Sequence, residues 1–458
     1  MAFQLSEERE TGHGNGSAPI PSLPTSHRIA LIMVAAILTS LIAIGTHYRA
    51  HPDEYYHADA FRFFEQHWWP PDLNSSEVIY SPQGWSRVYT SEIVYLAFGK
   101  VSRVAQLFLP LENRAFLIYR FSNAWLFLLT LGALFFTRCE WIDVQVLGLV
   151  FVCIPQVHYL YAYANSDAFG LSMGVFLFLL TAVMMDQPSR SWTYRHFTLL
   201  GALTGLVLVS KKPYLFSLML PYALIGTRLW REASRCNLNP SRKAIAHLVL
   251  VVVIAAVIAG PLRFVYPLTQ GDFAETVVQM REERATEEFK PSNPTYETHR
   301  LASKGEGYYE LLAERAWLQL SLKSFYGLFG YMNVPNPDWM YMVAGLAAIL
   351  AVCLTTFCAV LQWSDLSDAL QGALALSPVI FVLNTGASLA RSLHVGFQPQ
   401  GRYLFPSLIP VALVVTGSGL PESGKVRQVR KVIFGILYVL CLYSLVVTVL
   451  LNPELSRL

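Results

Sequence analysis

Long apolar runs separated by short polar connections dominate this sequence. A helix that crosses a bilayer needs about 20 mainly apolar residues, and roughly eleven segments meet or approach that requirement. They are residues 29–47, 115–137, 144–162, 168–185, 197–210, 213–229, 245–266, 339–361, 369–388, 402–417 and 432–451. The pattern therefore predicts an all-α fold, a polytopic transmembrane helical bundle of about eleven spans.

Basic residues indicate the orientation of these spans, because cytoplasmic connections carry an excess of Lys and Arg. With the N-terminus inside, the inner connections contain Arg138, Arg190, Arg195, Arg228, Arg231, Arg235, Arg242, Lys243, Lys425, Arg427, Arg430 and Lys431. The short outer connections contain only Lys211, Lys212, Arg391 and Arg402. We therefore expect residues 1–27, which are polar and rich in Gly, Ser and Pro, to form a disordered cytoplasmic tail.

One apolar segment does not fit this alternation as a span. Residues 89–110 are apolar enough to cross a bilayer, but Lys100 and Arg103 fall near the middle. If they did cross, every later basic connection would face outward, so we expect a helix on the outer surface. Two large extracytoplasmic loops result, at about 48–113 and 267–337, within one transmembrane domain over 28–452 that has no separate soluble domain.

Composition agrees with a membrane protein and excludes one class of partner. Of the 458 residues, 54% are hydrophobic and 14% are charged, whereas an ordinary soluble domain has about 25% charged residues. The mean hydropathy is +0.40. A net charge of +3 without a basic stripe gives no indication of nucleic-acid binding.

The first candidate for chemistry follows the first span directly, where Asp53 and Glu54 lie between His51 and His57. Charged residues at the mouth of a membrane helix are costly and mark functional sites. A carboxylate at a partly dehydrated boundary gains basicity, because desolvation disfavours its charged form, and this suits a general base. The alternative is that both acids only cap a helix that begins near Pro52.

Three further polar clusters fall on the expected outer side. The first contains Asn165 and Asp167, residue types that also serve in plain turns and helix caps. In the second, Lys211, Lys212 and Tyr214 form a tight connection that could bind a phosphate or simply reach lipid headgroups. The third runs from Arg391 through Gln400, Arg402 and Tyr403, and its arginines could clamp a phosphate or anchor the helix at the interface.

The order of these motifs resembles the GT-C superfamily of integral-membrane glycosyltransferases, which have an acidic motif in the first outer loop. Within it, the chain is most similar to a group of poorly characterised bacterial membrane proteins over residues 29–420. The motifs of that group read here as Pro52-Asp53-Glu54 with His57 (PDE-H), Asn165-Ser166-Asp167-Ala168 (NxDA), Lys211 or Lys212 before Pro213-Tyr214, Ser324 to Gly330, and Gln400-Gly401-Arg402-Tyr403 (QGRY).

The resemblance implies transfer of a hexosyl or pentosyl group from a polyprenyl-phosphate donor to an acceptor at the extracytoplasmic face. It makes Asp53 or Glu54 the catalytic carboxylate, with Asp53 as the general base. It also implies that the lysines and Arg402 hold the lipid phosphate. It also implies a multi-pass protein of the bacterial cytoplasmic (inner) membrane, a role in the cell envelope, and membrane lipids as partners. The expected substrate-binding residues are His57, Asn165, Asp167, Lys211, Lys212, Tyr214, Arg391, Gln400, Arg402 and Tyr403.

Several alternatives stay open at this point. Asp59 and Glu92 are further candidates for the catalytic acid. Some members of the superfamily need a divalent metal, Mg²⁺ or Mn²⁺, for which Asp53, Glu54 and Asp167 could supply oxygen ligands. A transporter or flippase of lipid-linked glycans, or a non-catalytic scaffold, would fit the same spans. A flippase would favour charges deep in several spans, and only Arg120 clearly has that position.

Overall fold

The computed structural model describes residues 23–109, 114–236, 242–293, 300–421 and 423–457. The expected tail therefore lies almost entirely outside the described residues. Within these ranges the fold is a bundle of helices, with one antiparallel pair of two-residue strands, β1 (Leu328–Phe329) and β2 (Val334–Pro335). The prediction of an all-α membrane bundle is confirmed.

Seven helices of the described chain are long and apolar enough to cross a membrane. They are α1 (Thr25–Gly45), α4 (Phe116–Phe136), α7 (Asp167–Met185), the span Ile245–Thr269 formed by α10 (Arg242–Gly260) and α11 (Tyr266–Thr269), α14 (Asp338–Leu361), α15 (Asp368–His394), and the span Gly424–Leu450, which begins with α17 (Gly424–Tyr443). An eighth span would combine α5 (Val144–Cys153) and α6 (Pro155–Tyr161), which meet at 82°. Pro155 has no N–H to continue α5, so the helix restarts there.

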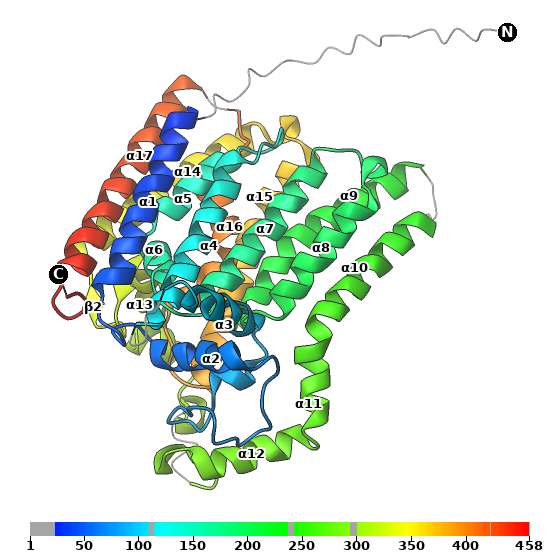
Figure 1. Cartoon of the computed structure of the whole chain (residues 1–458). Helices are drawn as coiled ribbons and strands as arrows, with labels where there is room; N and C mark the ends of the chain where they lie inside the picture. Colours follow the sequence, from blue (N-terminus) through cyan, green and yellow to red (C-terminus); the bar gives the residue numbers. More distant parts are fainter. Residues whose placement is uncertain (1–22, 110–113, 237–241, 294–299, 422, 458) are drawn as a thin grey trace.

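The three other expected spans are helical but do not meet the same criteria. They form α8 (Tyr194–Leu208), α9 (Met219–Cys236) and α16 (Leu408–Thr416), the last preceded by a 3₁₀ turn at Gly401–Ser407. α8 and α16 are shorter, and α9 carries several charged residues. All three nevertheless run beside the longer helices (Figure 1).

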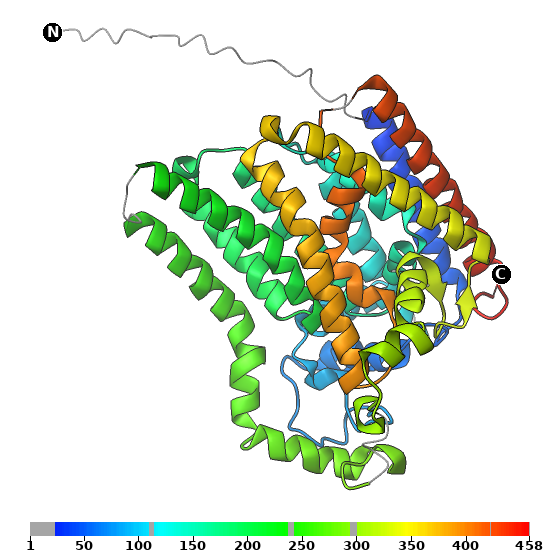
Figure 2. The same ribbon diagram turned by 180° about the vertical axis from the view of Figure 1, so that it is seen from behind.

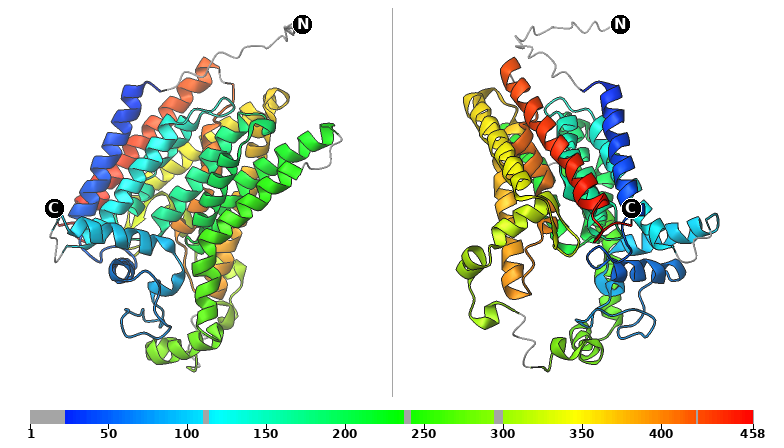
Figure 3. Two further views of the ribbon diagram at one scale, coloured as in Figure 1. Left: turned by 45° about the vertical axis from the view of Figure 1, so that its right-hand side comes forward. Right: turned by 90° about the vertical axis from the view of Figure 1, so that its left-hand side faces the viewer.

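Both large loops lie at one end of the bundle. α2 (Glu54–Gln66) and α3 (Ile93–Gln106) lie across this end, α12 (Phe273–Arg284) lies beyond them, and α1 begins at the opposite end (Figure 1). Two further views show the same protruding end (Figure 3). α3 falls within the segment expected on the surface, and it packs on α2 so closely that a Cβ at Gly99 would meet the Phe61 carbonyl oxygen at 2.7 Å.

The helices differ strongly in how deeply they are buried. In α7, 83% of the apolar window is buried inside the protein, against 22% in the span Ile245–Thr269 at the edge. Seen from behind, α14 and α15 occupy the opposite face, in yellow and orange (Figure 2). α13 (Trp317–Gly327), α14, α15 and α16 line a largely apolar cavity of about 1550 Å³ on this side of the bundle. The start of α7 is therefore central, and a large apolar space lies to one side of it.

Candidate functional site

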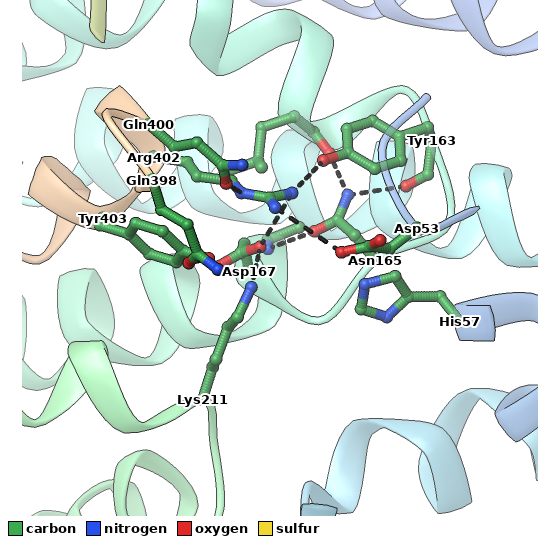
Figure 4. Close-up of polar contacts among 12 residues, drawn as sticks. Asp53, His57, Tyr163, Asn165, Asp167, Lys211, Gln398, Gln400, Arg402 and Tyr403 are labelled. Atoms are coloured by element: carbon green, nitrogen blue, oxygen red, sulfur yellow. Dashed lines mark hydrogen bonds and ion pairs between the residues drawn. The ribbon is translucent and has the colours of Figure 1, made fainter. Parts of the chain in front are cut away.

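Five charged side chains from distant parts of the sequence form an alternating chain at the loop-bearing end of the bundle. Arg87 donates to Asp53 Oδ2 at 2.9 Å, and Lys211 donates to Asp167 Oδ2 at 2.7 Å. Arg402 lies between the two carboxylates, 3.9 Å from each (Figure 4). Three cations thus face two carboxylates in this chain of ion pairs, and the buried Glu92 lies near Arg87.

Asp53 is held in an unusual backbone position directly before α2. Its φ is +59°, in the left-handed region that Asp and Asn tolerate better than most residues. Its side chain is 37% exposed, and no hydrogen bond from it caps the helix. The capping alternative from the sequence therefore does not describe Asp53, whose carboxylate instead turns toward Arg87 and Arg402.

Glu54 occupies a different environment although it is the next residue. It is fully buried and binds Arg120 through both oxygens, at 2.7 and 2.8 Å. The same oxygens accept from the backbone N–H groups of Arg49 and Ala164. Arg120 in turn donates to backbone carbonyls at the end of α1, including those of Ala43 and His47. This geometry is that of a structural ion pair that joins α1, α2 and α4.

The Asn165–Asp167 turn brings a second carboxylate to the cluster from the start of α7. Asn165 accepts from the Ala168 N–H at 3.0 Å and donates to the carbonyls of Leu160 and Tyr163, so both ends of its amide shape the turn. Asp167 is fully buried in the first turn of α7, where the helix dipole favours a negative charge. The turn thus positions Asp167, and Asn165 acts as its cap.

The two lysines of the next connection separate. Lys211 reaches Asp167 and is 12% exposed, and its ammonium group lies 5.4 Å from the Tyr403 ring. Lys212 begins the 3₁₀ helix Lys212–Leu218 and is exposed to solvent. Tyr214 is buried against α7, where a Cβ at Gly170 would meet its ring at 2.5 Å. Only Lys211 of this group belongs to the charged chain.

The connection before α16 supplies the central cation. Arg402 is 7% exposed, donates to Gln400 Oε1 at 2.8 Å and to the Tyr163 hydroxyl at 3.2 Å, and lies 5.6 Å from the Tyr403 ring. Arg391, at the end of α15, is exposed and lies 5.9 Å from the same ring. Arg402 is therefore fixed in place, while Arg391 adds a further positive charge at the edge.

His57 completes the cluster on the α2 side. It is fully buried, and its Nδ1 pairs with the Tyr95 hydroxyl of α3 at 2.7 Å. Burial lowers the pKa of His57 well below its ordinary value, and the nearby positive charges lower it further. The imidazole is therefore neutral at pH 7, with its Nε2 buried and without a hydrogen-bond partner in the described chain.

Sequence reasoning missed Arg87, which lies in the first large loop on a short 3₁₀ turn at Arg87–Thr90. No periodicity or motif surrounds it, so only its charge and outer position could have drawn attention. Of the alternative acids, Asp59 accepts from the Ile79 N–H at 3.0 Å, and burial raises its pKa. Glu92 is buried near Arg87 and Tyr95.

The donor set does not suit a divalent metal. Within the described ranges, no group of three or more His, Cys, Asp or Glu side chains could hold a metal ion. The other two carboxylates of the site, Asp53 and Asp167, are paired with Arg87 and Lys211 and have the guanidinium of Arg402 between them. Glu54 is committed to Arg120. A hard cation needs several oxygen ligands, and here the carboxylates are paired with cationic side chains instead.

Comparison with known proteins gives one family and a distant structural likeness. Residues 81–412 match a family described as predicted membrane protein (DUF2142). The match contains four of the five motifs and begins after Pro52–His57. No curated protein matches the sequence. Among solved structures, the chain is similar to two crystal structures of ArnT from Cupriavidus metallidurans. The structure bound to undecaprenyl phosphate has 14% sequence identity and a TM-score of 0.41, and the match covers 92% of this chain and 78% of that chain. The apo structure has 14% sequence identity and a TM-score of 0.38, and the match covers 86% of this chain and 78% of that chain.

Proposed function

The chain belongs to the DUF2142 family of predicted membrane proteins, and for this member we propose a membrane glycosyltransferase. It moves a sugar from a polyprenyl-phosphate donor to an acceptor hydroxyl, at the end of the bundle that carries the large loops. That end is extracytoplasmic in the proposal, because most basic connections lie at the other end. The observation that carries the proposal is the Arg87–Asp53–Arg402–Asp167–Lys211 chain.

The cations of this chain suit a phosphate ester. Arg402 offers a planar, fixed guanidinium that can pair with two phosphate oxygens, and Lys211 supplies a nearby point charge. Arg391 adds an exposed cation beside the Tyr403 ring. Three cations that converge on one place favour an anion over a neutral group, and this supports a phosphate as the group that leaves.

Asp53 is the proposed general base, because its carboxylate is partly exposed while that of Glu54 is buried and fully paired. Asp53 takes the proton of the acceptor hydroxyl as the acceptor oxygen forms a bond to the anomeric carbon. The bond from that carbon to the phosphate oxygen breaks, and the polyprenyl phosphate keeps the electron pair beside Arg402 and Lys211. A single displacement of this kind inverts the anomeric carbon.

The apolar cavity supports a lipid-linked substrate. Its volume is about 1550 Å³, and its lining is almost entirely aliphatic and aromatic, with Gln319, Lys323 and Asp338 among the few polar residues. It also lies next to the site, since Phe325 lines the cavity and a Cβ at Gly401 would meet the Phe325 nitrogen at 1.9 Å. A long hydrocarbon chain and a phosphate could therefore be held on neighbouring elements.

Purified protein in lipid nanodiscs tests the proposal in two steps. Mass spectrometry of co-purifying lipids should detect a polyprenyl phosphate or its glycosylated form. Asp53→Asn should abolish transfer of a radiolabelled sugar, whereas Asp365→Asn, which removes an exposed acid in the short helix Trp363–Asp365, should keep it. Substrate crossing of vesicles without sugar transfer would instead support the flippase, and normal transfer by Asp53→Asn would remove Asp53 as the base.

A further inference from the structure

Arg87 is held less firmly than the other two cations of the cluster. Arg402 is 7% exposed and donates to both Gln400 and Tyr163, while Lys211 is 12% exposed beside a buried carboxylate. The Arg87 side chain is 26% exposed, and Asp53 is its hydrogen-bond partner in the described part of the chain. Arg87 can therefore leave its carboxylate at lower cost than Arg402 or Lys211 can.

One oxygen of the Asp53 carboxylate is engaged by cations. Its Oδ2 accepts from Arg87 at 2.9 Å and lies 3.9 Å from Arg402. A carboxylate oxygen has about two lone-pair sites, and a proton acceptor needs one of them aimed at the reacting hydroxyl. While both guanidinium groups face Oδ2, an acceptor hydroxyl must compete with them for this oxygen.

An incoming phosphate ester changes this balance. The donor phosphate is a diester, which carries about one negative charge and presents two free oxygens, and it becomes a monoester with about −1.5 to −2 charges and three strong acceptor oxygens as the sugar leaves. Arginine pairs with phosphate in a two-pronged geometry that a single carboxylate oxygen does not offer. We propose that Arg87 is shared between Asp53 and the donor phosphate, and that it moves to the phosphate when the donor binds.

The exchange would free Oδ2 of Asp53 when a donor is present. This consequence rests on the proposed function, whereas the competition between Asp53 and a phosphate ester for Arg87 rests on the geometry alone. Arg87 then acts as a positioning residue whose partner depends on the state of the enzyme.

A double-mutant cycle on binding tests the competition without any turnover. The probe is geranyl phosphate, a soluble prenyl phosphate ester, and its Kd is measured by isothermal titration calorimetry on the full-length protein in nanodiscs. Asp53→Asn should bind the probe about two- to fivefold more tightly, as expected for loss of one partly exposed ion-pair competitor. Asn also tolerates the left-handed backbone at this position. Arg87→Gln should bind more weakly, and the double variant should match Arg87→Gln.

The cycle separates this exchange from general electrostatics. If Asp53→Asn tightened binding equally with and without Arg87, the gain would come from net charge, and the sharing of Arg87 would be refuted. An unchanged or weaker Asp53→Asn would refute it as well. Arg315→Gln is the matched control, because Arg315 is 39% exposed and paired with Glu306 within the second large loop. It should leave the Kd within about twofold, a change smaller than one surface ion pair produces.

Two arms of the experiment identify the source of the phosphate and keep the two proposals apart. Inorganic phosphate giving the same cycle at equal affinity would support the exchange but assign the site to a free anion, which would contradict the lipid-linked donor. Wild-type protein that binds geranyl phosphate but shows no dependence on Arg87 would refute the inference and leave the proposed function standing. Wild-type protein that binds neither probe would refute both.

Discussion

Replacing Glu54 with Gln is expected to destabilise the fold far more than the same kind of change at Asp53. Glu54→Gln removes the negative partner of Arg120, and both side chains are fully buried. Leaving one member of a buried ion pair without its partner costs about 3–5 kcal/mol. The Arg120 guanidinium keeps its hydrogen bonds to the carbonyls of Ala43, Thr46 and His47. We therefore expect the free energy of unfolding to fall by about 3 kcal/mol, near the lower end of this range.

Asp53→Asn is the matched comparison, because it changes the adjacent acid in the same way. Its ion pair with Arg87 is partly exposed, and such pairs contribute at most about 1 kcal/mol. The measurement is the apparent free energy of unfolding from SDS titration in mixed micelles, with folding yield in nanodiscs as a check. Equal losses for the two variants, or an unchanged Glu54→Gln, would refute the assignment of Glu54 as a structural residue.

Three other outcomes follow from the site and its support. Lys211→Met should weaken binding of a prenyl phosphate about tenfold or more, as expected for loss of a charged hydrogen bond. Lys212→Met should change the same Kd by less than about twofold. Calorimetry on the two variants measures both values. Burial lowers the pKa of His57 in the folded state, so below about pH 6.5 the unfolded chain binds more protons than the folded chain does. Folding stability should therefore decline as the pH falls through this range. His57→Gln should reduce that decline, measured by unfolding titrations from pH 7.5 to 5. Gly401→Ala should lower the thermal midpoint, since its Cβ would lie 1.9 Å from the Phe325 nitrogen, while Gly345→Ala, with nothing within 4 Å, should not.

The spans and the convergence of the motifs could be predicted because each depends on short-range pattern. Asp53, Asp167 and Arg402 all lie where a polar connection meets an apolar helix on the same side of the bundle. Alternation of the spans brings such residues to one surface whatever the details of packing. The sequence also identified Arg120 as a charge deep in a span, and the structure shows that its partner is Glu54.

Other features depend on tertiary geometry that no local pattern encodes. Asp53 and Glu54 have different environments because α2 begins between them. The Asp53 side chain is directed outward, and the Glu54 side chain is directed toward Arg120. Arg87 belongs to the site only because its loop folds back over α2. Three expected spans form helices that are shorter or more charged than the criteria for a membrane helix allow, and the local pattern alone did not separate them from the longer spans.

The Glu54–Arg120 pair also bears on how the chain is assembled in the membrane. The acid precedes the arginine by 66 residues, so it leaves the ribosome first, together with α1. An arginine that enters a bilayer on an isolated helix is costly. If the first loop has already crossed when α4 inserts, the emerging guanidinium meets a waiting counter-ion and a ring of carbonyls at the end of α1. The contact that stabilises the folded protein would then also bind α4 as this helix inserts into the membrane.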